Sequence, residues 1–297
     1  SIKDAYFIGK KFAVDIRKKY KSVKIAVGYD GRLSSPLLEK ELNKGLLDGG
    51  AKVNIIGVCP SPMLYYACIA LNCDGAIMIT GSHNPANYNG FKILSRDESY
   101  YGKKIINLAN TKIPSKPNTS GGKKYYNISE SYILELTKNL SKINKDLKVV
   151  WDPGNGATCE ILNRLIKIIP GNHIAINSNI DGTFPAHHPD PTVEKNLYDL
   201  KKMVIKEKAD IGIAFDGDGD RIGIVNSRGK FIPGDQLLLL FSNDILKEKT
   251  KCSIISDVKA SDILFREIKK MGGNPIMWKT GHSLIKEKMK ETGSVLA

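Results

Sequence analysis

The stretch Ala209-Asp210-Ile211-Gly212-Ile213-Ala214-Phe215 runs directly into Asp216-Gly217-Asp218-Gly219-Asp220-Arg221. The first seven residues are mostly apolar with little alternation, which is typical of a strand buried on both faces. The next six place three carboxylates at alternate positions, separated only by glycines. Because open α/β sheets bind ligands at the carboxyl ends of their strands, this boundary predicts both an α/β fold and a ligand site.

Three carboxylates this close together repel one another strongly unless a cation lies between them. In an extended segment, residues i, i+2 and i+4 point the same way, and the glycines let the backbone curl until the oxygens meet on one ion. An EF-hand is excluded, since counting from Asp216 puts Arg221 where that loop needs glycine and Ser227 where it needs glutamate. The oxygen ligands therefore predict a magnesium site at Asp216, Asp218 and Asp220, with a solvated acidic turn as the alternative.

The same order of strand, glycine-containing loop and amphipathic helix recurs along the chain. Lys24 to Val27 leads into Gly28-Tyr29-Asp30-Gly31-Arg32 and a helix from Pro36. Such alternation predicts an α/β protein of consecutive mixed-sheet domains flanked by helices. Residues 110–124 are rich in turn-forming types and predict a linker. We expect domains over residues 1–125, 126–230 and 231–297. Further strands are expected at 53–58, 76–80, 91–94, 148–151, 253–256 and 275–278, and further helices at 63–71, 131–140, 158–168, 236–247 and 261–271.

A second strand, Ile77-Met78-Ile79, runs into the loop Thr80-Gly81-Ser82-His83-Asn84-Pro85. A serine beside glycine can be approached closely by a ligand and can act as a nucleophile. Ser-His-Asn-Pro is also a good turn sequence, and from these residues alone the turn is the simpler interpretation. The Gly-x-Ser-x-Gly elbow of hydrolases is absent. Asn89-Gly90 predicts a tight turn before the strand at 91–94, and residues 226–229 predict a hairpin turn.

Together these motifs resemble those of the α-D-phosphohexomutase family, and within it the phosphomannomutase/phosphoglucomutase branch more than the phosphoglucosamine mutases. The resemblance runs in the family's order through nearly the whole chain. Its motifs are Gly28-Tyr29-Asp30-Gly31-Arg32, Thr80-Gly81-Ser82-His83-Asn84-Pro85, Asn89-Gly90-Phe91-Lys92, Trp151-Asp152-Pro153-Gly154-Asn155-Gly156, His187 to Val193, Asp216 to Arg221, Ser256-Asp257-Val258-Lys259 and Lys279-Thr280-Gly281-His282-Ser283.

The resemblance implies an isomerase that interconverts the 1-phosphate and 6-phosphate of mannose or glucose. Phosphorylated Ser82 would give its phosphoryl group to the sugar monophosphate, making a glucose or mannose 1,6-bisphosphate that turns round and returns the other phosphoryl group. Magnesium would be held by Asp216, Asp218, Asp220 and a phosphate oxygen on Ser82. The alternatives are a phosphoglucosamine mutase, a magnesium-dependent sugar phosphatase that releases phosphate steadily, and a non-catalytic sugar-phosphate binding protein.

Three further residues near these loops are candidates for the chemistry. Arg221 follows the acidic residues, and its planar fork suits a phosphate, with a surface arginine as the alternative. The resemblance makes Lys92 the general acid or base for the sugar hydroxyl, although a lone lysine on a strand is usually solvated. The resemblance also implies that His83 orients the phosphoserine or aids proton transfer. An ordinary turn histidine is the alternative.

In the third repeated unit the resemblance makes Lys259 and His282 sugar or phosphate contacts. Gly281-His282-Ser283 also fits a helix start with Ser283 as N-cap. His187-His188 is expected to be structural, because neighbouring residues face apart in an extended chain and no carboxylate spacing supports a zinc site. Five cysteines without a C-x-x-C pair predict buried thiols of a reducing, cytoplasmic compartment.

The composition and charge indicate which classes of binding partner to expect. A length of 297 residues predicts two or three domains, and 41% hydrophobic with 26% charged residues is ordinary for a globular protein. No apolar run approaches the roughly 18 residues that cross a membrane, so no membrane partner is expected. The net charge of +14 comes from scattered lysines, which does not favour nucleic acid, although a positive field would steer an anionic sugar phosphate. We expect a monomer, with a dimer as the alternative.

The chain also departs from the family pattern at its ends. The family opens with a strand and an arginine-bearing loop and closes with a fourth, phosphate-binding domain. Since the chain begins at Ser1 and stops at Ala297, where the glutamate-containing sugar loop is due, we expect this N-terminal strand and the C-terminal domain to be missing. A fragment without the distal phosphate grip is expected to be a poor mutase.

Overall fold

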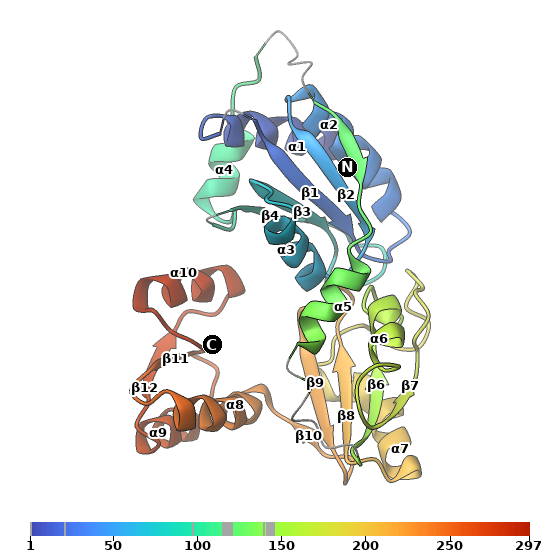
Figure 1. The fold of residues 1–297 in the computed structure, drawn as a ribbon, viewed down its shortest axis with the longest axis vertical. Helices are drawn as coiled ribbons and strands as arrows, with labels where there is room; N and C mark the ends of the chain where they lie inside the picture. Colours follow the sequence, from blue (N-terminus) through green and yellow to red (C-terminus); the bar gives the residue numbers. More distant parts are fainter. Residues whose placement is uncertain (1, 21, 97, 115–120, 139, 141–145) are drawn as a thin grey trace. The chain divides into compact units, whose positions relative to one another are not determined.

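A computed structural model describes residues 2–20, 22–96, 98–114, 121–138, 140 and 146–297 of the chain (Figure 1). The chain divides into two compact units, Ser1–Lys230 and Phe231–Ala297. Both units combine strands with flanking helices, which confirms the predicted α/β class. The larger unit holds two sheets, and the loops of interest lie at the ends of their strands.

The first sheet is mixed, with the strand order β4-β3-β1-β2-β5. Strands β1, β2, β3 and β5 are parallel, so their carboxyl ends meet at one edge, and β4 is antiparallel to β3. The elements of this half are α1 (Ile2–Arg17), β1 (Lys24–Tyr29), α2 (Ser35–Asp48), β2 (Lys52–Val58), α3 (Ser61–Ala70), β3 (Gly75–Ile79), β4 (Phe91–Ser95), α4 (Lys103–Ala109) and β5 (Lys123–Tyr125).

Helices cover both faces of the first sheet because alternate strand residues point to opposite sides. Ile25 and Val27 of β1 pack into the same core as Phe12 of α1 and Leu42 of α2. Ala26, between them in sequence, packs into a second core with residues of α3. The helices α1 and α2 therefore lie on one side of the sheet and α3 on the other, as Figure 1 shows.

The second sheet of the larger unit contains strands in the order β9-β8-β6-β7. β6 is parallel to β7 and β8, whereas β9 is antiparallel to β8. Gly212 and Ala214 of β8 are buried, but Ile211, Ile213 and Phe215 are only half-buried, so the expected burial on both faces is met on one face alone. The elements are α5 (Ser129–Thr137), β6 (Lys148–Asp152), α6 (Cys159–Leu165), β7 (Asn172–Ala175), the 3-10 helix η2 (Glu194–Leu197), α7 (Tyr198–Glu207), β8 (Ile211–Phe215) and β9 (Ile222–Asn226).

The smaller unit is built around a parallel pair of strands, β11 and β12. Leu246, Ile254, Leu264 and Ile268 form its core together with Cys252. Its elements are β10 (Phe231–Ile232), α8 (Gly234–Glu248), β11 (Ser253–Asp257), α9 (Asp262–Lys270), β12 (Asn274–Trp278) and α10 (His282–Thr292).

Several local predictions were wrong. The chain between β3 and β4 turns at residues 82–83, as Ser-His-Asn-Pro suggested, and at residues 86–87. It does not turn at Asn89-Gly90, because the carbonyl of Gly90 already accepts a bond of 3.0 Å from the Thr80 amide and extends the antiparallel ladder. Residues 123 and 124, within the predicted linker, belong to β5, since pairing with β2 outweighs their polar character. Residues 115–120 of that linker lie outside the described residues. The elements α4 and β7 had no prediction.

The predicted hairpin turn and the predicted burial of the cysteines are confirmed. The Gly229 amide donates to the Asn226 carbonyl at 2.9 Å, which closes the predicted hairpin turn. All five cysteines are free and buried. Burial raises the pKa of the Cys59, Cys68 and Cys159 thiols to about 12, so these thiols are inert at neutral pH. Within the described part of the chain, no helix combines the length and apolar character needed to cross a bilayer.

Candidate active site

The loop of residues 80–90, called the serine loop below, begins at the carboxyl end of β3. Ser82 has φ +49°, a left-handed backbone that is uncommon for serine. Its amide donates to Thr80 Oγ1 at 2.7 Å, and the Thr80 hydroxyl in turn donates to Asp30 Oδ2 at 2.7 Å. Asp30 lies in the loop after β1 and has no exposed surface. Asp30, at the end of the neighbouring strand β1, therefore fixes the backbone conformation of Ser82 through Thr80.

The acidic loop follows β8 and is a turn, not the extended segment that the alternating pattern suggested. Gly219 has φ +70°, and Asp216 Oδ1 accepts bonds from the amides of Asp220 and Arg221 at 3.0 and 3.1 Å. This turn still brings the carboxylates together. Asp216, Asp218 and Asp220 each offer an oxygen within 4.8 Å of the other two.

The serine loop and the acidic loop meet. The Ser82 hydroxyl donates to Asp216 Oδ2 at 2.8 Å, although 134 residues separate the two in sequence. The approach of the backbones is close, because a Cβ on Gly217 would lie 2.6 Å from the Ser82 carbonyl oxygen. Gly217 is therefore needed for the contact between the loops, in addition to any role in curling the acidic loop.

Asp218 is held from two further elements. Its Oδ2 accepts hydrogen bonds from the Ser61 hydroxyl, at the start of α3, and from Lys92 Nζ of β4 at 2.5 Å. Lys92 Nζ also lies 2.6 Å from Asp220 Oδ2. Sequence reasoning missed Ser61, whose amide also donates to the Asp218 carbonyl at 2.8 Å. Only the proline at the next position, typical of a helix start, marked this segment.

The acidic residues fit a hard divalent cation. Asp218 Oδ1 is buried and has no hydrogen-bond partner among the described residues. A buried carboxylate oxygen without a partner is costly, and a cation removes that cost. Its neighbours are further carboxylate oxygens, the ligand type that Mg²⁺ prefers. The predicted ligands Asp216, Asp218 and Asp220 are therefore assembled in one place.

The electrostatics of the site follow from burial and charge. Burial, reinforced by the charges of Asp218 and Asp220, raises the pKa of Asp216 to about 7. Burial alone would raise the pKa of Asp218, but the charge and hydrogen bond of Lys92 outweigh it and lower that pKa. Burial acts to lower the pKa of Lys92, yet the two carboxylates raise it overall. The lysine is thus held as an ammonium against the acidic residues.

His83 borders the serine hydroxyl, and the charge of Arg221 acts on His83. The Arg221 side chain is 39% exposed, and its Nη1 lies 3.8 Å from Asp190 Oδ1. His83 Nδ1 lies 3.5 Å from Ser82 Oγ, at the limit of a hydrogen bond. Burial, followed by the charge of Arg221, lowers the pKa of His83 and favours the neutral imidazole. His83 is therefore near Ser82, and the side chain of Arg221 is close enough to His83 to influence its charge.

His187 is held by hydrogen bonds to Asp152 and to the backbone. Its Nε2 lies 2.9 Å from Oδ2 of the fully buried Asp152, and its Nδ1 lies 3.0 Å from the His188 carbonyl. Burial would lower the pKa of His187, but the hydrogen bond and charge of Asp152 raise it overall. Protein groups bond both ring nitrogens of His187, which agrees with the structural role expected for that residue.

Lys259 and His282 belong to the smaller unit, whose position relative to the serine loop is not defined. The Lys259 side chain is 72% exposed, and its Nζ lies 3.4 Å from Asp257 Oδ2. Helix α10 begins at His282, after Gly281 with φ +135°. Ser283 is therefore inside the helix, and its predicted N-cap role was wrong. The role of Lys259 and His282 in binding substrate stays a prediction.

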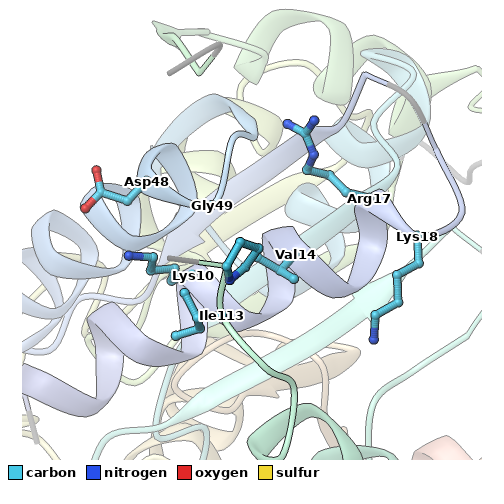
Figure 2. Close-up of a pocket in the computed structure, with 8 residues that line it drawn as sticks. Lys10, Val14, Arg17, Lys18, Asp48, Gly49 and Ile113 are labelled. Carbon is cyan, nitrogen blue, oxygen red and sulfur yellow. The ribbon is translucent and has the colours of Figure 1, made fainter. Parts of the chain in front are cut away.

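A separate cavity of about 260 Å³ lies beside α1 and the end of α2, and contains none of the predicted site residues (Figure 2). Its lysine and arginine side chains already have protein partners: Lys10 donates to Tyr6, Arg17 to the Gly50 carbonyl, and Lys18 to Asp15. We assign no function to this cavity.

Comparison with known proteins gives the family. Three family models match consecutive parts of the chain, and they describe domains I, II and III of the phosphoglucomutase/phosphomannomutase α/β/α architecture. They match residues 3–119, 130–229 and 233–297. The matches confirm consecutive α/β domains of the predicted type.

Named relatives and a solved structure agree. The chain is 43% identical over 295 residues to phosphomannomutase/phosphoglucomutase of Pseudomonas aeruginosa strain PAO1, a match that covers 99% of this chain and 63% of the relative. It is 40% identical to phosphoglucomutase of Neisseria meningitidis serogroup A, covering 99% of this chain and 64% of that protein. The structure of a phosphoglucomutase/phosphomannomutase family protein from Burkholderia thailandensis is similar with a TM-score of 0.93, at 37% identity, covering 99% of this chain and 66% of that one.

The chain thus spans about 63% of the length of the curated relatives that it matches first. Within that span the family models cover the smaller unit from residue 233 and both sheets of the larger unit except strand β5. The serine loop and the acidic loop, which the structure brings together, lie inside the matched domains I and II. On these grounds, the chain belongs to the phosphoglucomutase/phosphomannomutase family of α-D-phosphohexomutases.

Proposed function

We propose that this chain carries the phosphoserine site of a hexose phosphate mutase, with Ser82 as the residue that accepts and returns the phosphoryl group. The observation that carries the proposal is the 2.8 Å bond between the Ser82 hydroxyl and Asp216, the first of three clustered carboxylates. A serine held in a left-handed conformation beside such a cluster suits phosphoryl transfer, where positioning and charge neutralisation supply most of the rate.

Asp216, Asp218 and Asp220, with an oxygen of phosphorylated Ser82, are the residues that would hold magnesium. When bound, the ion neutralises charge on the phosphoryl oxygens. In the direction where Ser82 accepts a phosphoryl group, its Oγ attacks phosphorus and its proton leaves toward Asp216 Oδ2, the oxygen to which it donates. The Ser61 hydroxyl keeps Asp218 in place throughout.

Lys92 is the proposed general acid and base for the sugar hydroxyl. It is held as an ammonium beside Asp218 and Asp220, and as an acid it protonates the departing sugar oxygen. Arg221 is exposed enough to contact a phosphate, and the neutral imidazole of His83 borders the serine hydroxyl. Lys259 and His282 are proposed to contact the sugar phosphate.

The relatives' names support mannose and glucose phosphates as substrates. The Pseudomonas aeruginosa relative is named for both sugars and the Neisseria meningitidis relative for glucose. We extend this to the present chain, with glucose or mannose 1,6-bisphosphate as the intermediate and activator. A cytoplasmic location, a monomeric state and the domain limits 1–125, 126–230 and 231–297 remain predictions.

A coupled assay tests the proposal. The protein is primed with glucose 1,6-bisphosphate and Mg²⁺ and offered the 1-phosphates of glucose, mannose and glucosamine in turn. We expect 6-phosphate products from glucose and mannose, formed at the low rate expected for residues 1–297 assayed alone, with no steady release of inorganic phosphate. Phosphate release without isomer formation would instead identify a phosphatase, and preferential turnover of glucosamine phosphate would identify the other mutase class.

A further inference from the structure

Arg32 lies inside the protein, behind the serine loop. Its side chain has no exposed surface, and it sits in the loop that joins β1 to α2. A buried guanidinium is costly unless its charge is paired and its N–H groups are all bonded. The partners of Arg32 therefore indicate what this buried charge does.

All five N–H donors of the Arg32 guanidinium are used. Nε donates to Asp30 Oδ2 at 3.0 Å, so the charge is paired. The terminal nitrogens donate to four backbone carbonyls of the serine loop. Nη2 reaches Ser82 and Asn84 at 2.7 Å each, and Nη1 reaches Pro85 and, at 2.9 Å, Tyr88.

Two further neighbours, Phe184 and Gly81, define the space that the Arg32 guanidinium occupies. The Phe184 ring, which follows β7, lies with its centroid 5.0 Å from Arg32 Cζ. A Cβ on Gly81 would lie 2.5 Å from that carbon, so only glycine leaves room for the arginine. The glycine before the serine thus serves Arg32, although its sequence suggested close approach by a ligand.

We infer that Arg32 is the positioning residue of the serine loop: it fixes the place of Ser82 Oγ relative to Asp216 without touching that hydroxyl. Lysine cannot substitute, because an ammonium has three donors and no planar fork to bond a carboxylate and four carbonyls. The effect of Arg32 on catalysis rests on the proposed function. The effect of Arg32 on the loop rests on the contacts alone.

Phosphorylation of Ser82 by glucose 1,6-bisphosphate measures the catalytic effect. In this step a bond from phosphorus to Ser82 Oγ forms, the bond from phosphorus to the sugar oxygen breaks, and the serine proton is lost while the sugar oxygen gains one. For Arg32→Lys we expect the saturating rate to fall about 100-fold, because misplacement of about 1 Å has that cost. The half-saturating concentration should change less than about threefold, since binding is retained.

Arg96→Lys is the matched control. Arg96 also bonds a backbone carbonyl, that of Cys73, and pairs with a carboxylate, Asp74. Asp74 directly precedes β3, whereas the serine loop follows the other end of that strand. This variant should accept phosphate at the wild-type rate.

Hydrogen exchange of peptides covering residues 82–88 tests the loop directly. Arg32→Lys should exchange at least about tenfold faster there, with β1 and β3 unchanged. Gly81→Ala is a second variant for the case in which Arg32→Lys does not fold. It displaces the guanidinium without removing it, so it should give the same slower phosphorylation of Ser82 and the same faster exchange of residues 82–88.

Wild-type phosphorylation rate in the folded variants, or unchanged exchange of residues 82–88, would overturn the inference. If wild-type protein itself takes no phosphate on Ser82, the proposed function fails. The exchange measurement then still decides whether Arg32 holds the loop.

Discussion

At the scale of single residues, Ser61 shows how one hydroxyl in the first half of the chain orients a carboxylate in the second. It bonds Asp218 through both its hydroxyl and its amide, at the start of α3. Because residues that orient metal ligands typically contribute tenfold or more in affinity, Ser61→Ala should weaken Mg²⁺ binding about tenfold. Calorimetric titration measures this. Ser242→Ala, a buried serine bonded to the Leu238 carbonyl, is the control, and equal affinity in the two variants would contradict the role of Ser61.

Lys92 is expected to have opposite effects on metal binding and on catalysis. Its ammonium pairs with Asp218 and Asp220, so Lys92→Met should tighten Mg²⁺ binding by relieving competition for these oxygens. The same change should lower phosphoryl transfer about 100-fold or more, since the proton donor is lost. Lys148→Met, which breaks the pair with Glu207, serves as control. Weaker Mg²⁺ binding in Lys92→Met would show that the lysine stabilises the site in another way.

The sequence pattern predicted the reactive side chains better than their supports. Ser82 and Asp216 could be found because each follows an apolar strand in a glycine-containing loop. Arg32 and Ser61 could not be assigned in this way, because their partners, apart from Asp30, lie 50 or more residues away and no local pattern records such contacts.

At the scale of elements, the contact between the two loops depends on Gly217. Alanine there would place a Cβ 2.6 Å from the Ser82 carbonyl oxygen, so the loops would have to separate. Gly217→Ala should slow phosphorylation of Ser82 about 100-fold while the protein stays folded. The control is Gly122→Ala, where a Cβ would meet no atom within 4 Å. Equal rates in both variants would mean that the loops tolerate separation.

The loop that carries His187 should make stability depend on pH. Asp152 raises the pKa of His187 above its unfolded value near 6.5, and Asp199 adds to this effect. The stabilisation is therefore complete below about pH 6.5 and is lost as pH rises through the higher pKa of the folded state. His187→Gln should cost more stability near pH 6 than near pH 9, measured by denaturant unfolding. A cost that is constant with pH would contradict the ion pair.

Element types were predictable where periodicity and flanking glycines agreed, as for β1, β3 and β8. The boundaries of the elements and the positions of the turns were less predictable from the sequence. The carboxylates of the acidic loop converge through a turn and a left-handed Gly219, which alternation alone cannot distinguish from a continuing strand. The short strand β5 forms because β2 offers it an edge, and its own residues are exposed and polar.

At the scale of the whole molecule, two sheets of the larger unit present their loops to one another, so that a serine from one meets carboxylates from the other. The most direct test is the site of phosphorylation. The protein is incubated with Mg²⁺ and glucose 1,6-bisphosphate and analysed by intact mass and peptide mapping. We predict one phosphoryl group per chain, on Ser82, with uptake abolished in Ser82→Ala and severely slowed in Asp216→Asn. Phosphate on another residue, or undiminished uptake by Ser82→Ala, would contradict the proposed role of Ser82.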